Sequence, residues 1–213
     1  MKKIITDYFD MKYNVSYNGI ITDIPYKGCI RGKLGEEDFD IIEFLYKADN
    51  DTLTDSFLIT FCNMRCLIDI VNACNLSNWT YHTYQIWDKS PTRNWISWTM
   101  PLRTTEYIVY LKKGKYKYCF KDGTEKPAYK RKSFGGKLKS TTKNTNKKSY
   151  GMYSEIVTFK NPRKKIHPTE KPKEFSTMFK QIVGNVLVLD PFCGTGNLIC
   201  EFDNSLGVDV VNY

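Results

Sequence analysis

An acid, a proline and an aromatic ring follow one another directly after an apolar run near the start of the chain. The run 17–22 is followed by Asp23, Ile24, Pro25 and Tyr26, within the stretch ITDIPYKG. A carboxylate beside a rigid turn can accept hydrogen bonds from a ligand, and the ring can stack on a flat one. Asp and Pro are also ordinary turn formers, so the stretch alone favours the simpler interpretation of a strand end at the edge of a core.

A glycine-rich turn near the end of the chain is the most informative stretch. The β-branched run 186–189 predicts a buried strand that delivers Asp190 to its carboxyl end. Gly194 and Gly196 then allow a tight turn before a helix expected to start near Asn197. A dinucleotide site favours a third glycine three residues later, where this chain has isoleucine, and no Gly-Lys-Ser/Thr follows to form a phosphate loop. The turn therefore argues against NAD and against a P-loop.

A second acid follows the glycine turn at the end of the next expected strand. The stretch NSLGVDV predicts a strand that ends in Asp209. An acid at that position can accept hydrogen bonds from both ribose hydroxyls of a nucleoside. A nucleoside-bearing ligand without a pyrophosphate fits the two features together, and S-adenosylmethionine is the obvious candidate.

Three motifs resemble those of the S-adenosylmethionine-dependent DNA amino-methyltransferases. DPFCGTG is similar to their cofactor motif, KIHPTEKP resembles their second cofactor motif of His-Pro-x-x-Lys-Pro form, and TDIPY is similar to their catalytic Asp-Pro-Pro-Tyr. The order of the motifs, with the catalytic one first and a basic insertion before the other two, resembles the permuted β class of that family. The resemblance spans nearly the whole chain. It implies an α/β, Rossmann-like methyltransferase fold with a mostly parallel central sheet, helices on both faces and a circularly permuted motif order.

The resemblance implies how the first motif would work. The Asp23 carboxylate and the Ile24 carbonyl would accept the two N–H groups of an exocyclic amine, drawing its nitrogen toward tetrahedral geometry and freeing the lone pair for the methyl sulfonium. Pro25 would stiffen the turn, and Tyr26 would stack on a base flipped out of the duplex. The family usually has proline where Ile24 stands. The carbonyl acceptor survives this change, and the lost stiffness amounts to roughly 0.4 to 1 kcal/mol.

The resemblance also implies a set of cofactor contacts. The segment around His167 would lie against the methionine end of the cofactor, with Thr169 and Lys171 as its main contacts. Phe192 would pack beneath the cofactor, although a core phenylalanine is nearly as good an interpretation. The other contacts implied by the resemblance are Asp7 with the adenine, Asp190, Gly194, Gly196, Asn197 and Asp209.

The resemblance narrows the substrate to an exocyclic amine of a base. Aspartate at the first position of TDIPY favours adenine N6, because the cytosine-N4 enzymes of the family usually carry serine there. Cytosine C5 is disfavoured, because that reaction needs a cysteine nucleophile and the chain has no Pro-Cys. We therefore expect methylation of adenine N6 in a short DNA sequence, with base flipping. Cytosine-N4 methylation, RNA as the substrate, and a catalytically degenerate DNA-binding protein of the same fold are the alternatives.

The positive charge of the chain is concentrated in one segment. The net charge is +9, yet residues 112–165 hold 18 Lys/Arg against three acids, which leaves the remainder at −6. Such a segment is typical of contact with a polyanion, and its tyrosines offer flat faces to bases, although a solvated basic loop has the same composition. Double-stranded DNA is the expected partner. The candidate DNA contacts are Lys89, Arg93, Lys130, Arg131, Lys132, Lys137 and Lys139.

Alternating apolar and amphipathic stretches must position these residues. Strands are expected at 2–6, 17–23, 55–63, 79–89, 104–114 and 185–190, and helices at 38–47, 64–74 and 172–183. Trp87 and His82, on one of these strands, are interpreted as structural. The predicted organisation is a catalytic half (1–111), a basic target-recognition insertion (112–165) and a cofactor-binding half (166–213).

Composition indicates a cytoplasmic protein. No run of 18 apolar residues and no signal peptide is present, so no membrane contact is expected. The seven cysteines include no C-x-x-C pair and no histidines at ligand spacing, so we expect buried thiols in a reducing compartment and no metal. A monomer or homodimer is expected, and a cognate restriction endonuclease is a partner that the resemblance allows. Abundant Lys, Asn, Ile and Tyr is typical of an AT-rich bacterial or phage genome.

Overall fold

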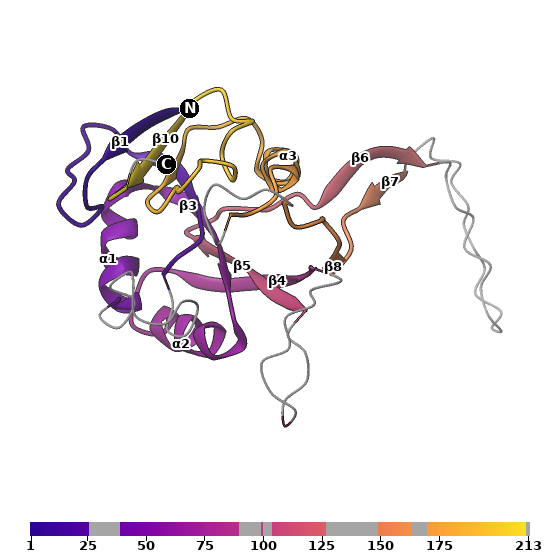
Figure 1. Ribbon diagram of the computed structural model, residues 1–213, viewed down its shortest axis with the longest axis horizontal. Helices are drawn as coiled ribbons and strands as arrows, with labels where there is room; N and C mark the ends of the chain where they lie inside the picture. Colours follow the sequence, from indigo (N-terminus) through magenta and orange to yellow (C-terminus); the bar gives the residue numbers. More distant parts are fainter. Residues whose placement is uncertain (26–38, 90–98, 100–103, 127–148, 163–169, 212–213) are drawn as a thin grey trace.

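A central sheet forms the body of the described part of the protein (Figure 1). The computed structural model describes residues 1–25, 39–89, 99, 104–126, 149–162 and 170–211. Within these residues, eight strands form one sheet in the order β1-β10-β9-β2-β3-β5-β4-β8, and β6 pairs with β7 in a separate two-stranded sheet. The strands are β1 (Lys2–Ile5), β2 (Tyr17–Thr22), β3 (Thr52–Cys62), β4 (Thr80–Asp88), β5 (Thr105–Lys113), β6 (Lys121–Lys126), β7 (Ser149–Met152), β8 (Ile156–Val157), β9 (Val188–Asp190) and β10 (Ser205–Asp209). The helices are α1 (Ile41–Asp51), α2 (Met64–Cys74) and α3 (Glu174–Val183).

The large sheet is parallel except for β5, which runs antiparallel to both of its neighbours, β3 and β4. The carboxyl ends of the parallel strands therefore share one edge, and β5 begins at that edge. The strand β9, from the end of the chain, lies beside β2, from its beginning. The order of the strands reverses at this junction, which is where open α/β sheets bind their ligands.

Side-chain alternation along the strands builds a core on each face of the sheet. On β3, Leu58 and Cys62 belong to the core under α1 and α2, whereas Phe57, Ile59 and Phe61 belong to the core under α3. Figure 1 shows α1 and α2 together and α3 apart from them. The expected α/β fold with a mostly parallel sheet and helices on both faces is confirmed.

Local sequence signals begin and end the helices. The Asp40 side chain accepts hydrogen bonds from the backbone N–H groups of Ile42 and Glu43, and caps α1. The Asn63 side chain caps α2 in the same way. Helix α3 ends at Gly184, whose φ of 85° lies in the left-handed region that favours glycine.

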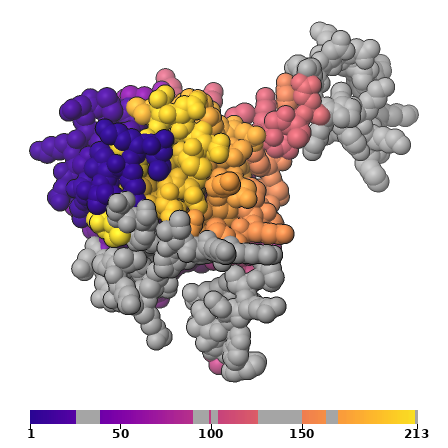
Figure 2. Space-filling model, turned by 45° about the horizontal axis from the view of Figure 1, so that its top comes forward, coloured from indigo at the N-terminus to yellow at the C-terminus, as the bar shows by residue number. Residues whose placement is uncertain are grey.

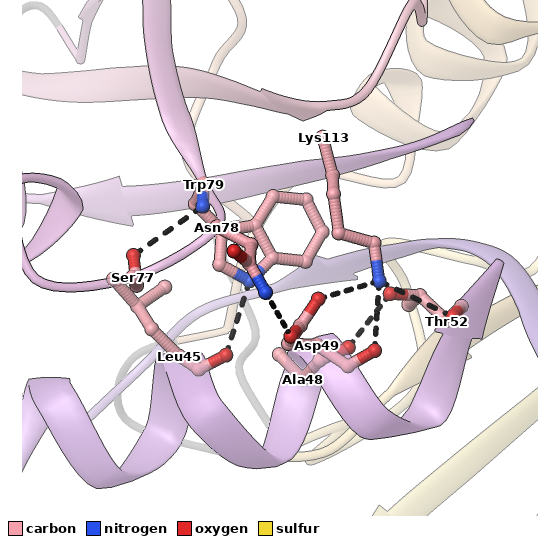
Figure 3. A network of polar contacts seen from close by, with 8 residues as sticks. All are labelled: Leu45, Ala48, Asp49, Thr52, Ser77, Asn78, Trp79 and Lys113. Carbon is pink, nitrogen blue, oxygen red and sulfur yellow. Dashed lines mark hydrogen bonds and ion pairs between the residues drawn. The ribbon is translucent and has the colours of Figure 1, made fainter. Parts of the chain in front are cut away.

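A polar network at the opposite edge of the sheet joins α1 to β4 and β5 (Figure 3). The Lys113 Nζ atom, at the end of β5, lies 2.7 Å from both the carbonyl and the Oδ1 atom of Asp49. The Trp79 indole donates to the Leu45 carbonyl at 3.1 Å. The Lys113 ammonium thus satisfies a carbonyl in the last turn of α1 and places a positive charge where the helix dipole favours one.

Two local expectations about the glycine turn were wrong. The strand before it is β9, Val188–Asp190, and does not begin at Val186. Residues 197–201 form consecutive turns where a helix was expected, with Ile199 N donating to Gly196 O and Phe202 N donating to Ile199 O. Each of these bonds spans three residues, and few residues remain before β10 begins, so the chain turns back without completing a regular helix.

The start of the basic segment belongs to the body of the protein. The rings of Tyr116 and Tyr118, which were expected to offer faces to bases, pack with Phe120 against the core under α3. Tyr118 also donates a 2.5 Å hydrogen bond to the Leu111 carbonyl. Strands β6 and β7 extend away from the body, and in Figure 2 they project to one side of it. The described residues of the segment are thus divided between core and arm.

The described residues include neither a helix long and apolar enough to span a membrane nor a group of three or more potential metal ligands. The cysteines are less uniformly buried than expected. Cys62, Cys66 and Cys193 are buried, whereas Cys119 and Cys200 are exposed.

Candidate functional site

Acidic side chains gather where the parallel strands end. Asp23 directly follows β2, and Asp190 and Asp209 are the last residues of β9 and β10. Strands β2 and β9 pair with Ile20 opposite Leu189, so the turn after Asp23 and the glycine turn lie at neighbouring strand ends. The fold thus brings together two motifs that are far apart in the sequence.

Backbone geometry explains both glycines of the turn. Gly194 has a φ of 49° and Gly196 a φ of 80°, conformations that side chains with a Cβ rarely adopt. The Lys3 ammonium donates to the Gly194 carbonyl at 2.7 Å, and the Gly194 N–H donates to Asp209 Oδ2 at 2.6 Å. The turn is therefore held against β1 on one side and against the end of β10 on the other.

The Asp209 carboxylate already accepts hydrogen bonds from the protein backbone. Besides the bond from Gly194, its Oδ1 atom accepts the backbone N–H of Val211 at 3.0 Å. Each carboxylate oxygen can accept two hydrogen bonds, so Asp209 retains acceptor capacity on both oxygens. The proposed contact with ribose hydroxyls remains chemically available.

The other described residues of the expected cofactor set lie around the turn. Asp7 is exposed just beyond β1 and accepts the N–H of Phe9 at 2.9 Å. Phe192 lies in an aromatic cluster, with ring centroids 5.8 Å from Tyr8 and 5.9 Å from Phe44. The Asn197 amide donates to Glu170 Oε1 at 2.8 Å and to the carbonyl of Lys171 at 3.0 Å, which ties the segment before α3 to the turn.

A chain of four alternating charges runs from the end of β2 to the end of β4. The Lys171 ammonium forms an ion pair and hydrogen bond with Asp23 Oδ2, and it lies 3.4 Å from Glu106 Oε2. Glu106 Oε1 in turn lies 2.8 Å from the Lys89 Nζ atom. Lys171, expected beside the cofactor, thus has two carboxylate partners. Lys89, expected on DNA, is part of the same network.

These charges are largely removed from water. The exposed fraction of the side chain is 6% for Lys171, 17% for Asp23 and 15% for Glu106. Burial, reinforced by the charge of Glu106 and opposed by that of Lys171, raises the pKa of Asp23 to about 6. Burial would also raise the pKa of Glu106, but the Lys171 and Lys89 ammonium groups outweigh it and lower that pKa.

The two oxygens of the Asp23 carboxylate differ in their partners. Its Oδ2 atom pairs with Lys171, whereas its Oδ1 atom is buried and has no hydrogen-bond partner among the described residues. A buried acceptor without a partner is costly, so such an atom is typical of a site completed by something else. Ile24 is 2% exposed and packs in the core, which anchors the turn.

Two further buried polar atoms lie between β2 and β9. Asp190 is fully buried, and its Oδ1 atom accepts the Phe192 N–H at 3.2 Å. Its Oδ2 atom and Thr22 Oγ1 are also buried, and a side-chain hydrogen bond from Thr22 favours the charged form of Asp190. Burial, with smaller contributions from the charges of Asp23 and Asp209, raises the pKa of Asp190 to about 7.

The Asp190→Asn variant is expected to have a flatter pH dependence of stability. A carboxyl whose pKa is raised from 3.8 to about 7 in the folded state stabilises it below about pH 4, and this contribution is lost as the pH rises through 7. Asparagine does not titrate, so the variant lacks this pH-dependent contribution, and its side-chain oxygen can still accept the Phe192 N–H. The slope of the unfolding free energy between pH 4 and 7 should change by up to about 1.4 kcal/mol per pH unit in urea titrations. Unchanged slopes, like those expected of the exposed control Asp203→Asn, would contradict this assignment.

Glu106 is the site residue that the sequence analysis missed. It shares a strand face with Ile108 and Tyr110, both of which are buried in the core under α3. A glutamate in register with buried apolar residues is a signal that could have identified it, because buried charges are rare unless they are paired.

Several expected site residues lie outside the described ranges. They are Tyr26, Arg93, Lys130, Arg131, Lys132, Lys137, Lys139, His167 and Thr169. Two residues interpreted as structural agree with the fold. Trp87 is buried and donates to the Phe159 carbonyl at 2.9 Å, and His82 stacks on Tyr118 with ring centroids 5.2 Å apart.

The fold is shared with solved structures of M1.HpyAVI. The chain is similar to a crystal structure of the M1.HpyAVI-SAM complex with a TM-score of 0.68 and 20% sequence identity, over 99% of this chain and 94% of the other. A second M1.HpyAVI structure gives a TM-score of 0.69 and 17% identity, over 99% of this chain and 92% of the other. No protein-family model and no curated protein matches the sequence. At these identities the likeness establishes the fold.

Proposed function

We propose that this protein is a DNA methyltransferase that transfers the methyl group of S-adenosylmethionine to the exocyclic N6 of adenine after base flipping. The observation that carries the proposal is the unpartnered buried oxygen of Asp23 at a strand end adjacent to the glycine turn. The shared fold supports it, because one of the similar M1.HpyAVI structures is a complex with SAM. The motif order of the sequence supports the β class.

The residues of the glycine turn fit the proposed cofactor. Asp209 has spare acceptor capacity for ribose hydroxyls, and exposed Asp7 lies beyond the neighbouring strand β1, within the same edge of the sheet. The left-handed glycines keep side chains out of the turn itself. The buried side chains of Thr22 and Asp190 add polar groups between the two motifs. When bound, the cofactor supplies an electrophilic methyl group on a sulfonium.

Asp23 supplies the acceptor that activates the target amine. Its Oδ1 atom would receive one N–H of the amine, and the carbonyl of Ile24 the other, which localises the nitrogen lone pair for attack on the methyl group. The acquired methyl makes the nitrogen acidic, so the proton can leave without a strong base. A carboxyl with a pKa of about 6 is mostly ionised at neutral pH and can accept these bonds.

The basic segment would supply contacts to the DNA backbone. The arm of β6 and β7 projects from the body, and its Tyr150 ring is 42% exposed with the Lys121 ammonium 4.3 Å from the ring centroid. An exposed ring beside a cation suits stacking on a base and attraction to phosphate. A restriction endonuclease partner and a monomeric or dimeric state stay predictions.

Replacing Lys130, Arg131 and Lys132 together with alanine should weaken DNA binding at low salt. Each lost phosphate contact lowers the slope of log affinity against log salt by about 0.9, so the triple variant should lose roughly 2 to 3 units of slope. Fluorescence anisotropy with a DNA duplex at several salt concentrations measures this slope. The control Lys180→Ala changes a lysine of α3 and should keep the wild-type slope. A triple variant with the wild-type slope would exclude these residues from the interface.

Transfer of labelled methyl groups from S-adenosylmethionine to DNA tests the proposed function. Digestion of the product to nucleosides should yield N6-methyladenosine in its deoxy form. Labelled N4-methylcytosine would instead establish the alternative target, and label in RNA alone would replace DNA as the substrate. A protein that gives no heat with S-adenosylmethionine in calorimetry would instead be a catalytically degenerate DNA-binding protein.

A further inference from the structure

We infer that Glu106 is a positioning residue for the proposed reaction, because it shares the Lys171 ammonium with Asp23 and so controls how strongly that ammonium neutralises the catalytic carboxylate. The inference rests on the proposed function and extends it to a residue outside the three motifs. It assigns a role to the one strand of the large sheet, β5, that runs antiparallel to its neighbours.

The geometry places Lys171 between two competing acids. Its ammonium pairs with Asp23 Oδ2 and lies 3.4 Å from Glu106 Oε2. The antiparallel direction of β5 puts its second residue, Glu106, at the edge where β2 ends. A parallel strand in that place would present its carboxyl end there, and this glutamate would lie at the far side of the sheet.

A second lysine balances Glu106 from the other side. Lys89 Nζ lies 2.8 Å from Glu106 Oε1, so the two oxygens of this carboxylate face two different ammonium groups. The network contains two acids and two lysines, and it is neutral as a whole. Removal of Glu106 therefore leaves more positive charge near Asp23, and removal of Lys89 leaves less.

The low exposure of the network lets each of these charges act strongly on Asp23. Side-chain exposure is 18% for Lys89 and 15% for Glu106, so water screens their charges only weakly. Without Glu106, the Lys171 ammonium would belong to Asp23 alone and hold it more tightly. A carboxylate that is more fully neutralised is a poorer acceptor for the amine, and the reaction should slow.

The other groups that face Asp23 do not replace Glu106. Asp190 on β9 and Cys62 at the end of β3 interact with it electrostatically. Asp190 is a second acid. A side-chain hydrogen bond with Cys66, together with burial, raises the pKa of Cys62 and keeps it protonated. Among the described residues, the titratable groups that face Asp23 are then Lys171, Glu106, Lys89, Asp190 and Cys62.

Two variants should shift the protonation of Asp23 in opposite directions. Glu106→Gln removes the negative charge that raises the pKa of Asp23, so that pKa should fall. Lys89→Met removes a positive charge that lowers it and frees Glu106 to draw Lys171 away, so the pKa should rise. A role in folding alone predicts no such pair of opposite shifts.

The test measures kcat for methyl transfer at saturating DNA and cofactor between pH 5 and 9. The acidic limb should move by about one pH unit to lower pH in Glu106→Gln and to higher pH in Lys89→Met, and kcat at pH 8 should fall about threefold to tenfold in Glu106→Gln. Saturating DNA separates kcat from any change in DNA affinity. The control Asp203→Asn removes an exposed acid near the opposite edge of the sheet and should leave the profile unchanged.

A direct titration separates this inference from the proposed function. Carbon-13 NMR of the Asp23 carboxyl in the three proteins reports its pKa without any turnover. Opposite shifts together with the altered kcat profiles support the role of Glu106. An active wild type whose variants keep its pH profile overturns this inference and leaves the function intact, whereas an inert wild type overturns the function itself. Identical Asp23 titrations in all three proteins overturn the charge sharing.

Discussion

The Asp23→Ala variant is expected to bind S-adenosylmethionine like the wild type and to lose methyl transfer by at least about 100-fold to 1000-fold. The variant lacks a hydrogen-bond acceptor that is preorganised in a buried site. Removal of one such preorganised group slows other enzymes by a factor of this size. Lys171 keeps Glu106 as a partner in the variant, so no buried ammonium is left without an acid. The turn itself is held by Ile24, which is buried in the core.

Calorimetry for the cofactor and a labelled-methyl assay for transfer measure the two halves of this expectation. Asp203→Ala is the matched control, because it removes an exposed aspartate whose side chain is 69% accessible. It should keep both binding and transfer. An Asp23→Ala protein that retained most of its activity would refute the assigned role of the carboxylate.

The Lys171→Met variant is expected to be about 3 to 5 kcal/mol less stable than the wild type at pH 8. Methionine keeps the apolar stem but leaves Asp23 and Glu106 as two buried carboxylates without the cation between them, and breaking a buried pair in this way has a cost of that order. For a chain of this size, the loss corresponds to a fall in Tm of roughly 6 to 20 °C.

The loss of stability in Lys171→Met should depend on pH in a defined direction. The pKa of Asp23 is already raised to about 6, and without Lys171 it rises further. A carboxyl whose pKa is higher in the folded than in the unfolded protein stabilises the folded state at pH values below its pKa in the unfolded protein. This stabilisation is lost as the pH rises through its pKa in the folded protein. The variant should therefore approach the wild type at pH 5 and fall furthest behind it at pH 8.

Urea unfolding at both pH values measures this difference. The control Lys180→Met removes a lysine that pairs with exposed Asp203 at 3.5 Å, and such exposed pairs contribute at most about 1 kcal/mol. Equal losses for Lys171→Met at pH 5 and pH 8, or a loss no larger than that of the control, would show that the ammonium does not balance the two acids.

Most of the secondary structure could be predicted from the sequence because its signals are local. The apolar positions of α3, Phe175, Met178, Phe179 and Ile182, recur at helical spacing and are all buried. The second half of the run 186–189 forms a buried strand that ends in Asp190. The segment after Gly196 was harder to predict, because a few residues between a glycine turn and the next strand are too short for the helical period to show.

The sequence by itself determined which acids would stand at the ends of strands, because Asp23, Asp190 and Asp209 each follow an apolar run directly. Only the tertiary structure decided what surrounds them. Lys171 and Asp23 are 148 residues apart in sequence, and Glu106 reaches them only because β5 enters the sheet antiparallel. Strand order and direction depend on how distant segments pack together, and the periodicity of a single segment does not record them. The charges on Lys171 and Glu106 are visible in the sequence, but their shared environment exists only in the folded protein.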